Sequence, residues 1–307
     1  VMMFNAASKV GAVIPGWSAV EELNYTNVVT ISTQDLFPSS TIRLHGIKTF
    51  EKERIDLAIL YAASILVKAK STLRDIFLSV IEGKTEILYN VENLTCETGF
   101  GYMGWIQNNR IFVGSRAMMI RHDIEVPSLD YEDKYTKGTK CPIYLAVSGK
   151  LFGMFLVSYR ADESAAAVVD DLKNAGISLM VRADDFNVTC DMISRVYDVE
   201  PECIKLLTQE ELPVLASSTE YTPDSEGAMT HLGSFTSFIG GLRAAIGAAS
   251  AERAATIIQC AAIIFSLVIT LLLTVTGGIR ALSLPAILMY QFAWLVLTVS
   301  IPLAKRY

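Results

Sequence analysis

The sequence predicts an α/β domain that is split by an inserted α+β domain and followed by a pair of transmembrane helices. Three observations lead to this prediction. β-Branched runs alternate with amphipathic helical patterns in residues 24–41 and 157–245. Residues 42–156, which lie between these two parts, contain the short strand-like runs of an antiparallel sheet. Residues 254–304 contain two long apolar runs.

The split α/β domain is predicted from four elements in a strand and helix order. Asn27–Ser32 is β-branched and predicts a buried strand. Glu163–Ala175 is an amphipathic helix pattern, and Gly176 stands where a helix C-cap belongs. Ile177–Val181 predicts a second strand and Asp191–Tyr197 a second helix. A strand, helix, strand order indicates a parallel, doubly wound sheet.

The inserted domain begins with a helical stretch and continues as strands. Leu57–Val80 is Ala-rich at its start and predicts a helix. Gly149 and Lys150 form a turn signal between two strands of a hairpin. The predicted strands are Lys84–Tyr89, Met103–Ile106, Arg110–Val113, Ile143–Val147 and Leu151–Val157.

Two apolar runs, Thr256–Gly277 and Ala281–Leu303, predict a transmembrane hairpin joined by a short turn. A buried hairpin of a soluble protein is the alternative. Basic residues flank the outer ends of the hairpin, and the turn holds a single arginine, so the positive-inside rule places both ends and the headpiece in the cytosol. We therefore expect an integral membrane protein, in the plasma membrane, with the lipid bilayer as a partner. The basic residues that flank the outer ends of the hairpin are Arg243, Arg253, Lys305 and Arg306, and the arginine in the turn is Arg280.

Composition excludes several classes of protein. The chain has 307 residues, a net charge of −6 and 51% hydrophobic residues. The sequence has no stretch dense enough in Lys and Arg to indicate a nucleic-acid partner. Five cysteines occur without a C-x-x-C pair, which argues against a zinc site or a disulfide framework and favours reduced thiols. No metal site is predicted, because His45, His122 and His231 are scattered along the chain.

The order of motifs resembles the second half of a P-type ATPase, most closely the heavy-metal branch. Residues 7–14 and 19–23 resemble the stalk, so 1–23 are expected to continue an upstream membrane helix. Glu97–Gly101 with Val113–Ser115 resembles the pattern G-x-G-V followed by V-G-N, and Leu172–Ile177 matches L-K-x-A-G-I. The resemblance implies a HAD-like phosphorylation domain, an inserted nucleotide-binding domain, and upstream membrane and actuator parts as intramolecular partners.

The resemblance also assigns candidate site residues. Ser32 falls at the position of the phosphorylated Asp in D-K-T-G-T-L-T, and Asp184 falls at the Asp of T-G-D. The family implies ATP and Mg²⁺ as cofactors, with nucleotide contacts at Gly99, Gly101 and Gly114, whose missing Cβ lets the backbone approach a ligand closely.

Several positions depart from the family pattern. Ser32 cannot supply the carboxylate nucleophile of an aspartyl phosphate. The nearby Asp35 is either a displaced nucleophile or a solvated turn residue. Arg182 replaces the threonine of T-G-D and either holds an anion or is solvated.

Two further motifs are missing altogether. The acidic G-D-G-x-N-D pair is absent after the strand expected at Leu212–Ala216. Residues 69–74 lack the His-Pro pair that meets adenine in the heavy-metal branch. Residues 158–164 keep only the final Glu-Ser of the hinge motif D-P-L-R-x-E-S.

These departures favour a pseudo-ATPase, in which the pump scaffold is kept, nucleotide and Mg²⁺ binding is weak or lost, and aspartyl-phosphate formation is lost. A functional heavy-metal cation pump with atypical motifs is one alternative. A membrane regulatory or interaction module is the other.

Overall fold

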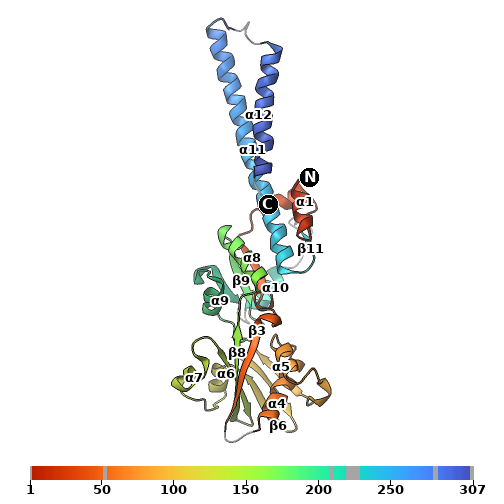
Figure 1. The fold of residues 1–307 in the computed structure, drawn as a ribbon, viewed down its shortest axis with the longest axis vertical. Coiled ribbons are helices and arrows are strands. Elements are labelled where there is room, and N and C mark those ends of the chain that lie inside the picture. Colours follow the sequence, from red (N-terminus) through yellow and green to blue (C-terminus); the bar gives the residue numbers. More distant parts are fainter. Residues whose placement is uncertain (1, 51–53, 208–210, 219–228, 279–282, 305–307) are drawn as a thin grey trace. The chain divides into compact units, whose positions relative to one another are not determined.

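The computed structural model describes residues 2–50, 54–207, 211–218, 229–278 and 283–304 (Figure 1). The chain divides into two compact units. One unit comprises Asn27–Glu220, and the other combines Val1–Thr26 with Tyr221–Tyr307. Each unit has its own core.

The unit Asn27–Glu220 contains a three-stranded parallel sheet, which together with its helices we call the parallel-sheet domain. The strand order is β10-β9-β2, and both pairs are parallel. Gly176 ends the first helix after the inserted domain with a left-handed φ of +69°, as predicted. The elements are β2 (Val28–Ser32), α3 (Thr33–Leu36), α8 (Glu163–Asn174), β9 (Ser178–Arg182), α9 (Cys190–Tyr197) and β10 (Ile204–Leu207).

Strand β2 lies at the edge of this sheet among the described residues, which corrects one expectation. A buried strand was predicted, and Val29 and Ile31 are buried, but the alternate residue Val28 is 47% exposed. An edge strand that packs on one face alternates in this way. The β-branched composition alone does not distinguish a fully buried strand from an edge strand that packs on one face.

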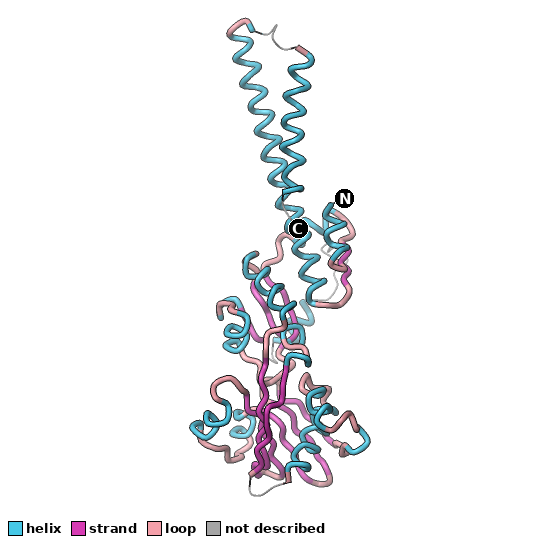
Figure 2. Tube along the Cα trace, in the orientation of Figure 1, coloured by secondary structure: helices cyan, strands magenta, loops and turns pink. Residues whose placement is uncertain are grey.

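The inserted domain is a six-stranded antiparallel sheet with helices on both faces (Figures 1 and 2). Phe155 and Met154 are neighbours on one strand and point to opposite faces. Phe155 packs edge-on against Phe77 of α5, with ring centroids 5.0 Å apart, whereas Met154 joins a cluster with Met118 of α6. The strands, in sheet order, are β3 (Ile42–Thr49), β8 (Lys150–Tyr159), β7 (Cys141–Val147), β6 (Asn109–Gly114), β5 (Gly101–Ile106) and β4 (Glu92–Glu97). The helices are α4 (Ile55–Lys68), α5 (Arg74–Val80), α6 (Arg116–Arg121) and α7 (Leu129–Thr136).

Two predictions for the inserted domain were wrong in detail. The helix expected at Leu57–Val80 is two helices, because Lys70 takes a left-handed φ of 53° after α4. The strand expected at Lys84–Tyr89 is a single 3₁₀ turn at Thr85–Ile87, and β4 is the strand that forms the sheet edge. β4 is polar and largely exposed, so hydrophobic patterning does not reveal it.

The chain passes from the parallel-sheet domain into the inserted domain and back along two paired strands. β3 and β8 are antiparallel, with a register that runs from Ile42 opposite Tyr159 to Thr49 opposite Gly153. The pair therefore connects the domains by hydrogen-bonded backbone rather than by loose linkers. This confirms the predicted split α/β fold with an inserted α+β domain.

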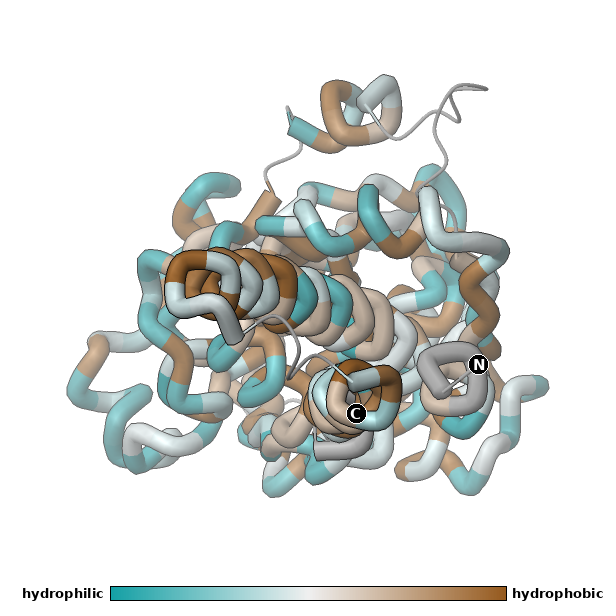
Figure 3. The backbone as a smooth tube through the Cα atoms, turned by 90° about the horizontal axis from the view of Figure 1, so that it is seen from above, coloured by the Kyte–Doolittle hydropathy of each residue, from teal (hydrophilic) through white to brown (hydrophobic). Residues whose placement is uncertain are grey.

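The second unit is built around α11 (Phe235–Val275), a helix of 41 residues. Its first turns pack against the N-terminal segment through small side chains. A Cβ on Gly241 would lie 2.6 Å from the Cβ of Ala12, so glycine permits this close approach. Apolar residues recur along α11 and α12 (Figure 3). The remaining elements are α1 (Met2–Lys9), β1 (Ala12–Val13), α2 (Trp17–Leu23), β11 (Thr230–His231) and α12 (Leu284–Ala304).

The structure gives the two predicted membrane spans different support. Among the described residues, α11 is long and apolar enough to cross a membrane, whereas the apolar part of α12, Leu284–Ser300, is shorter than 18 residues. α11 begins at Phe235, so the predicted boundaries at residues 245 and 254 both fall inside one helix. Residues 279–280 of the predicted turn lie outside the described residues.

Candidate functional site

A cleft of about 410 Å³ lies between the parallel-sheet domain and the inserted domain. This volume is within the range of small-molecule sites. The parallel-sheet domain contributes residues that follow β2 and β9, where the carboxyl ends of parallel strands place ligand-binding side chains. The principal lining residues are Gln34, Arg182, Asp184 and Phe186 from that domain, and Lys70, Thr72, Cys96, Glu97, Thr98, Gly99, Gly101 and Tyr102 from the inserted domain.

Ser32 ends β2 and lies opposite Arg182 in the parallel register. Its backbone N–H donates to Asp35 Oδ2 at 2.8 Å. Asp35 is the third residue of α3, so this bond is the carboxylate half of a capping box. The carboxylate is therefore turned back onto the helix start. Neither of the two candidate nucleophile residues lines the cleft.

Asp184 reaches the cleft and is already paired. Arg182 Nε lies 3.0 Å from Asp184 Oδ1, and both side chains are partly exposed. The backbone N–H of Asp184 donates to Thr33 Oγ1 at 3.2 Å, which ties the loop after β9 to the start of α3. The negative charge of Asp184 offsets the positive charge of the Arg182 guanidinium, which weakens the attraction of Arg182 for an anion.

The three candidate glycines divide into two groups. Gly99 lies in the turn before β5 with a φ of +78°, and nothing lies within 4 Å of where its Cβ would be. Gly101 and Gly114 are cross-strand partners. A Cβ on Gly101 would lie 2.4 Å from Val113 O, and one on Gly114 would lie 2.4 Å from Phe100 O. Gly99 and Gly101 line the cleft and Gly114 does not. Backbone packing thus accounts for Gly114 without a ligand.

Burial changes the acidity of two groups at the cleft. It raises the pKa of Tyr102 to about 12 and raises the pKa of the Cys96 thiol. Both groups are therefore protonated near neutral pH. Sequence reasoning did not select either residue, although both lie within a few residues of the Gly99 motif.

Asp185 is a buried acidic residue that sequence reasoning missed. Its side chain is 2% exposed, and its carboxylate accepts hydrogen bonds from Thr72 and Tyr159. Burial raises its pKa above the usual value for aspartate. The pattern of the motif drew attention to Asp184, and no local signal distinguishes which of two adjacent aspartates is buried.

The strand expected at Leu212–Ala216 is not a strand. These residues belong to helix α10 (Glu211–Ser218), and the described strand in this part of the chain is β10. Pro213 accounts for the difference, because proline is accepted in the first turn of a helix and disfavoured inside a sheet. Residues 212–216 therefore do not form the strand end that the acidic pair would follow.

Each of the three scattered histidines has a hydrogen-bond partner, and the backbone N–H of Gly233 donates to His231 Nδ1 at 3.1 Å. His45 Nε2 lies 2.6 Å from Ser158 Oγ, and His122 Nε2 lies 2.6 Å from Glu97 Oε1. Among the described residues, no group of three or more His, Cys, Asp or Glu side chains is arranged for a metal ion.

No family model matches the chain. It is 19% identical over 204 residues to copper-transporting ATPase 2 of Rhizobium meliloti, covering 66% of this chain and 25% of the relative. It is 25% identical over 124 residues to a copper-exporting P-type ATPase of Staphylococcus haemolyticus, covering 40% and 16%. The chain thus spans about a quarter or less of the length of these curated relatives.

Two solved structures align with the chain. A zinc-transporting PIB-type ATPase in an E2·Pi state aligns with 98% of this chain and 53% of its own, at 13% identity and a TM-score of 0.48. The catalytic domain of a CPx-ATPase aligns with 70% of this chain and 75% of its own, at 14% identity and a TM-score of 0.46.

The parallel-sheet domain and its insertion, followed by an apolar helix long enough to cross a membrane, have the element order of a P-type ATPase-like protein. The homologues are copper-transporting P-type ATPases, so the predicted resemblance to the heavy-metal branch is confirmed.

The cleft residues do not fit a Mg²⁺ ion held by carboxylates. Mg²⁺ is ordinarily bound by carboxylates together with substrate phosphates. The two carboxylates in the described lining face basic side chains. Asp184 pairs with Arg182, and Glu97 Oε1 contacts His122 Nε2. The buried Glu97 Oε2 has no hydrogen-bond partner among the described residues and lies 3.8 Å from Arg121 Nε.

Proposed function

We propose that this chain belongs to a membrane-embedded pseudo-ATPase, which keeps the scaffold of a heavy-metal P-type pump and does not form an aspartyl phosphate. One observation carries the proposal. Ser32 stands at the strand end where the family has its nucleophile, and Asp35, the nearest carboxylate in sequence, is bound to the backbone N–H of Ser32. Aspartyl-phosphate formation needs a free carboxylate in line with the γ-phosphate.

The proposal includes weak nucleotide binding in the cleft. Gly99 supplies backbone without a Cβ atom on one side of the cleft, which supports an adenosine-sized ligand. Arg182 is held by Asp184, so strong phosphate contacts are not expected from it. ATP and Mg²⁺ are therefore proposed as weak or lost cofactors rather than as parts of a catalytic cycle.

The experiment is labelling with γ-labelled ATP and Mg²⁺ in membranes that contain the protein. We expect no acid-stable, hydroxylamine-sensitive phosphoenzyme. Labelling that is abolished by Asp35→Asn would overturn the proposal and support the working-pump alternative, with Asp35 as a displaced nucleophile. Ser32→Asp alone is not expected to restore labelling, because the neighbouring positions of the D-K-T-G-T motif also differ.

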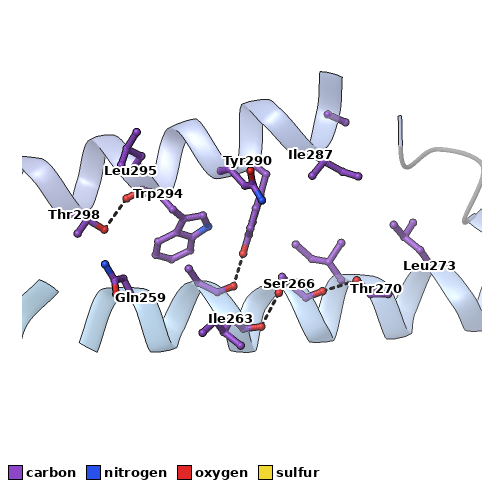
Figure 4. Close-up of a pocket in the computed structure, with 14 residues that line it drawn as sticks. Gln259, Ile263, Ser266, Thr270, Leu273, Ile287, Tyr290, Trp294, Leu295 and Thr298 are labelled. Atoms are coloured by element: carbon purple, nitrogen blue, oxygen red, sulfur yellow. Dashed lines mark hydrogen bonds between the residues drawn. The ribbon is translucent and has the colours of Figure 1, made fainter. Parts of the chain in front are cut away.

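A groove between α11 and α12 favours the third hypothesis, a membrane interaction module (Figure 4). The groove has a volume of about 750 Å³, and its lining includes the amides of Gln259 and Gln291. Tyr290 Oη donates to Ala262 O at 2.6 Å, which joins the two helices. Amide side chains in a bilayer pair with other helices. If the module hypothesis holds, Gln291→Leu should weaken helix association measured by energy transfer in vesicles.

We propose that the headpiece and both ends of the hairpin lie in the cytosol, with upstream membrane and actuator parts completing the protein. The bias of Lys and Arg around the apolar runs supports this orientation.

A further inference from the structure

A polar cluster around the buried carboxyl of Asp185 joins the inserted domain to the parallel-sheet domain. We call it the Asp185 cluster, and it comprises Thr72, Tyr159, Asp185 and Asn187. Tyr159 Oη and Thr72 Oγ1 donate to Asp185 Oδ2 at 2.8 and 3.0 Å. The backbone N–H of Asn187 donates to Oδ1 at 2.9 Å. The carboxylate therefore accepts three hydrogen bonds away from solvent.

The members of the cluster come from three different parts of the unit. Asp185 lies in the loop after β9, in the parallel-sheet domain. Thr72 lies between α4 and α5, in the inserted domain. Tyr159 is the last residue of β8, where the chain returns from one domain to the other. One carboxylate thus connects both domains and the strand between them.

Aromatic packing holds Tyr159 at the crossing point. Its ring lies 5.5 Å from that of Phe37, in an edge-on arrangement, and Phe37 packs at the same distance against Tyr197. Tyr197 Oη in turn donates to Leu36 O. Ile42 pairs with Tyr159 across the two connecting strands. The connection is therefore supported by packing and hydrogen bonds on the side of the parallel-sheet domain.

All three side chains of the hydrogen-bonded core come from segments that depart from the family motifs. Tyr159 lies in the altered hinge segment, Asp185 directly follows the T-G-D position, and Thr72 lies in the segment that lacks the His-Pro pair. Three segments that lie far apart in the sequence thus meet at the Asp185 carboxyl.

Separating the domains would withdraw the Thr72 hydroxyl from Asp185, whereas Tyr159 is held by its ring contacts on the side of the parallel-sheet domain. A buried charged or polar group that loses its partners carries a large desolvation penalty, which is greater than the net gain from forming the same bonds. Hinge motion between domains ordinarily takes place where few contacts cross the linker.

From these contacts we infer that the Asp185 cluster holds the inserted domain and the parallel-sheet domain in one fixed arrangement, so that the cleft keeps one width whether or not a ligand is bound. This inference is independent of the proposed loss of phosphorylation, because it concerns the contact between the domains and not the chemistry at Ser32.

The test measures the interdomain distance in the full chain in membranes. Fluorophores are attached to noncanonical amino acids at Asp133, exposed on α7, and Ala167, exposed on α8. Single-molecule energy transfer should give one narrow population with and without 5 mM ATP, a concentration of about the order that saturates a millimolar site. Tyr159→Phe and Thr72→Val should each add a second, longer-distance population.

Thr72→Ser is the matched control, because it keeps the hydroxyl donor and should leave a single population. Asp185→Asn should resemble Tyr159→Phe. If Asp185→Asn does not fold, Tyr159→Phe and Thr72→Val are sufficient to test whether the cluster fixes the two domains. Two interconverting populations in the unaltered protein, or a single population in both of these variants, would overturn the inference.

Discussion

Asp35 accepts the backbone N–H of Ser32 at 2.8 Å, so the carboxylate nearest the family's nucleophile position serves as a helix cap. A carboxylate in the first turn also interacts favourably with the helix dipole. We predict that Asp35→Ala lowers the free energy of unfolding by about 1 kcal/mol, the typical value of a lost cap. Denaturant unfolding of the protein in detergent measures this.

The control for Asp35→Ala is Asp133→Ala, which removes an exposed acidic residue from α7. It should change the free energy of unfolding by less than about 0.5 kcal/mol. Equal effects of the two substitutions would mean that the bond to Ser32 contributes nothing, and Asp35 would again be available for chemistry.

Gly101 should tolerate no side chain. A Cβ there would lie 2.5 Å from Gly114 Cα and 2.7 Å from Met118 Sδ, at a φ of +149°. Overpacking and backbone strain together predict that Gly101→Ala lowers the free energy of unfolding by about 3 kcal/mol. Gly99→Ala has open space around the new methyl group and should cost only about 1 kcal/mol, from its positive φ. Thermal unfolding of both variants distinguishes the two roles, and the reverse order of stability would contradict the packing of β5 on β6.

The pH dependence of stability should report Asp185. Burial raises the pKa of this carboxyl, and Asp184, Tyr159, Tyr102 and the Cys141 thiol lie around it. The folded protein therefore keeps the proton at pH values where the unfolded chain has released it. The folded state binds more protons, so the free energy of unfolding falls as the pH rises from about 4 through the raised pKa.

Asp185→Asn should remove that part of the pH dependence. As the pH rises, the unaltered protein should therefore lose more free energy of unfolding than the variant does. Asp133→Asn controls for the loss of one acidic residue. A difference in the free energy of unfolding between the unaltered protein and Asp185→Asn that is constant between about pH 4, the usual carboxyl pKa, and about pH 8 would show that Asp185 ionises no differently in the folded and unfolded chain.

The sequence predicted the order of the main elements because β-branched runs and helix caps are local signals. Gly176, for example, marks the end of α8 in both the sequence and the structure. Hydrophobic patterning could not reveal β4, because an exposed edge strand carries polar residues. It also could not identify the Asp185 cluster. Thr72 and Asp185 are 113 positions apart, and only the fold brings a threonine hydroxyl to that carboxylate.

Nucleotide binding to the cleft should be weak and nearly independent of the phosphate chain. The cleft keeps Gly99, while Arg182 is paired with Asp184 and the His-Pro pair of the family is absent. Each lost hydrogen bond to a charged group costs about 1.5–3 kcal/mol, and about 1.4 kcal/mol is tenfold in affinity. We expect ATP, ADP and AMP to bind with similar dissociation constants in the millimolar range, or weaker, and Mg²⁺ to have little effect.

Gly99→Ala and Gly149→Ala form a matched pair for locating that site. Both glycines have positive φ values, +78° and +84°, and open space around a new Cβ, but only Gly99 lines the cleft. Their effects on stability should therefore be similar, while only Gly99→Ala should weaken binding measured by NMR titration with AMP. Equal weakening by both substitutions would place the nucleotide elsewhere. Micromolar, Mg²⁺-dependent preference for ATP in the unaltered protein would instead favour a working pump, because such a preference requires specific contacts to the phosphates and to the metal.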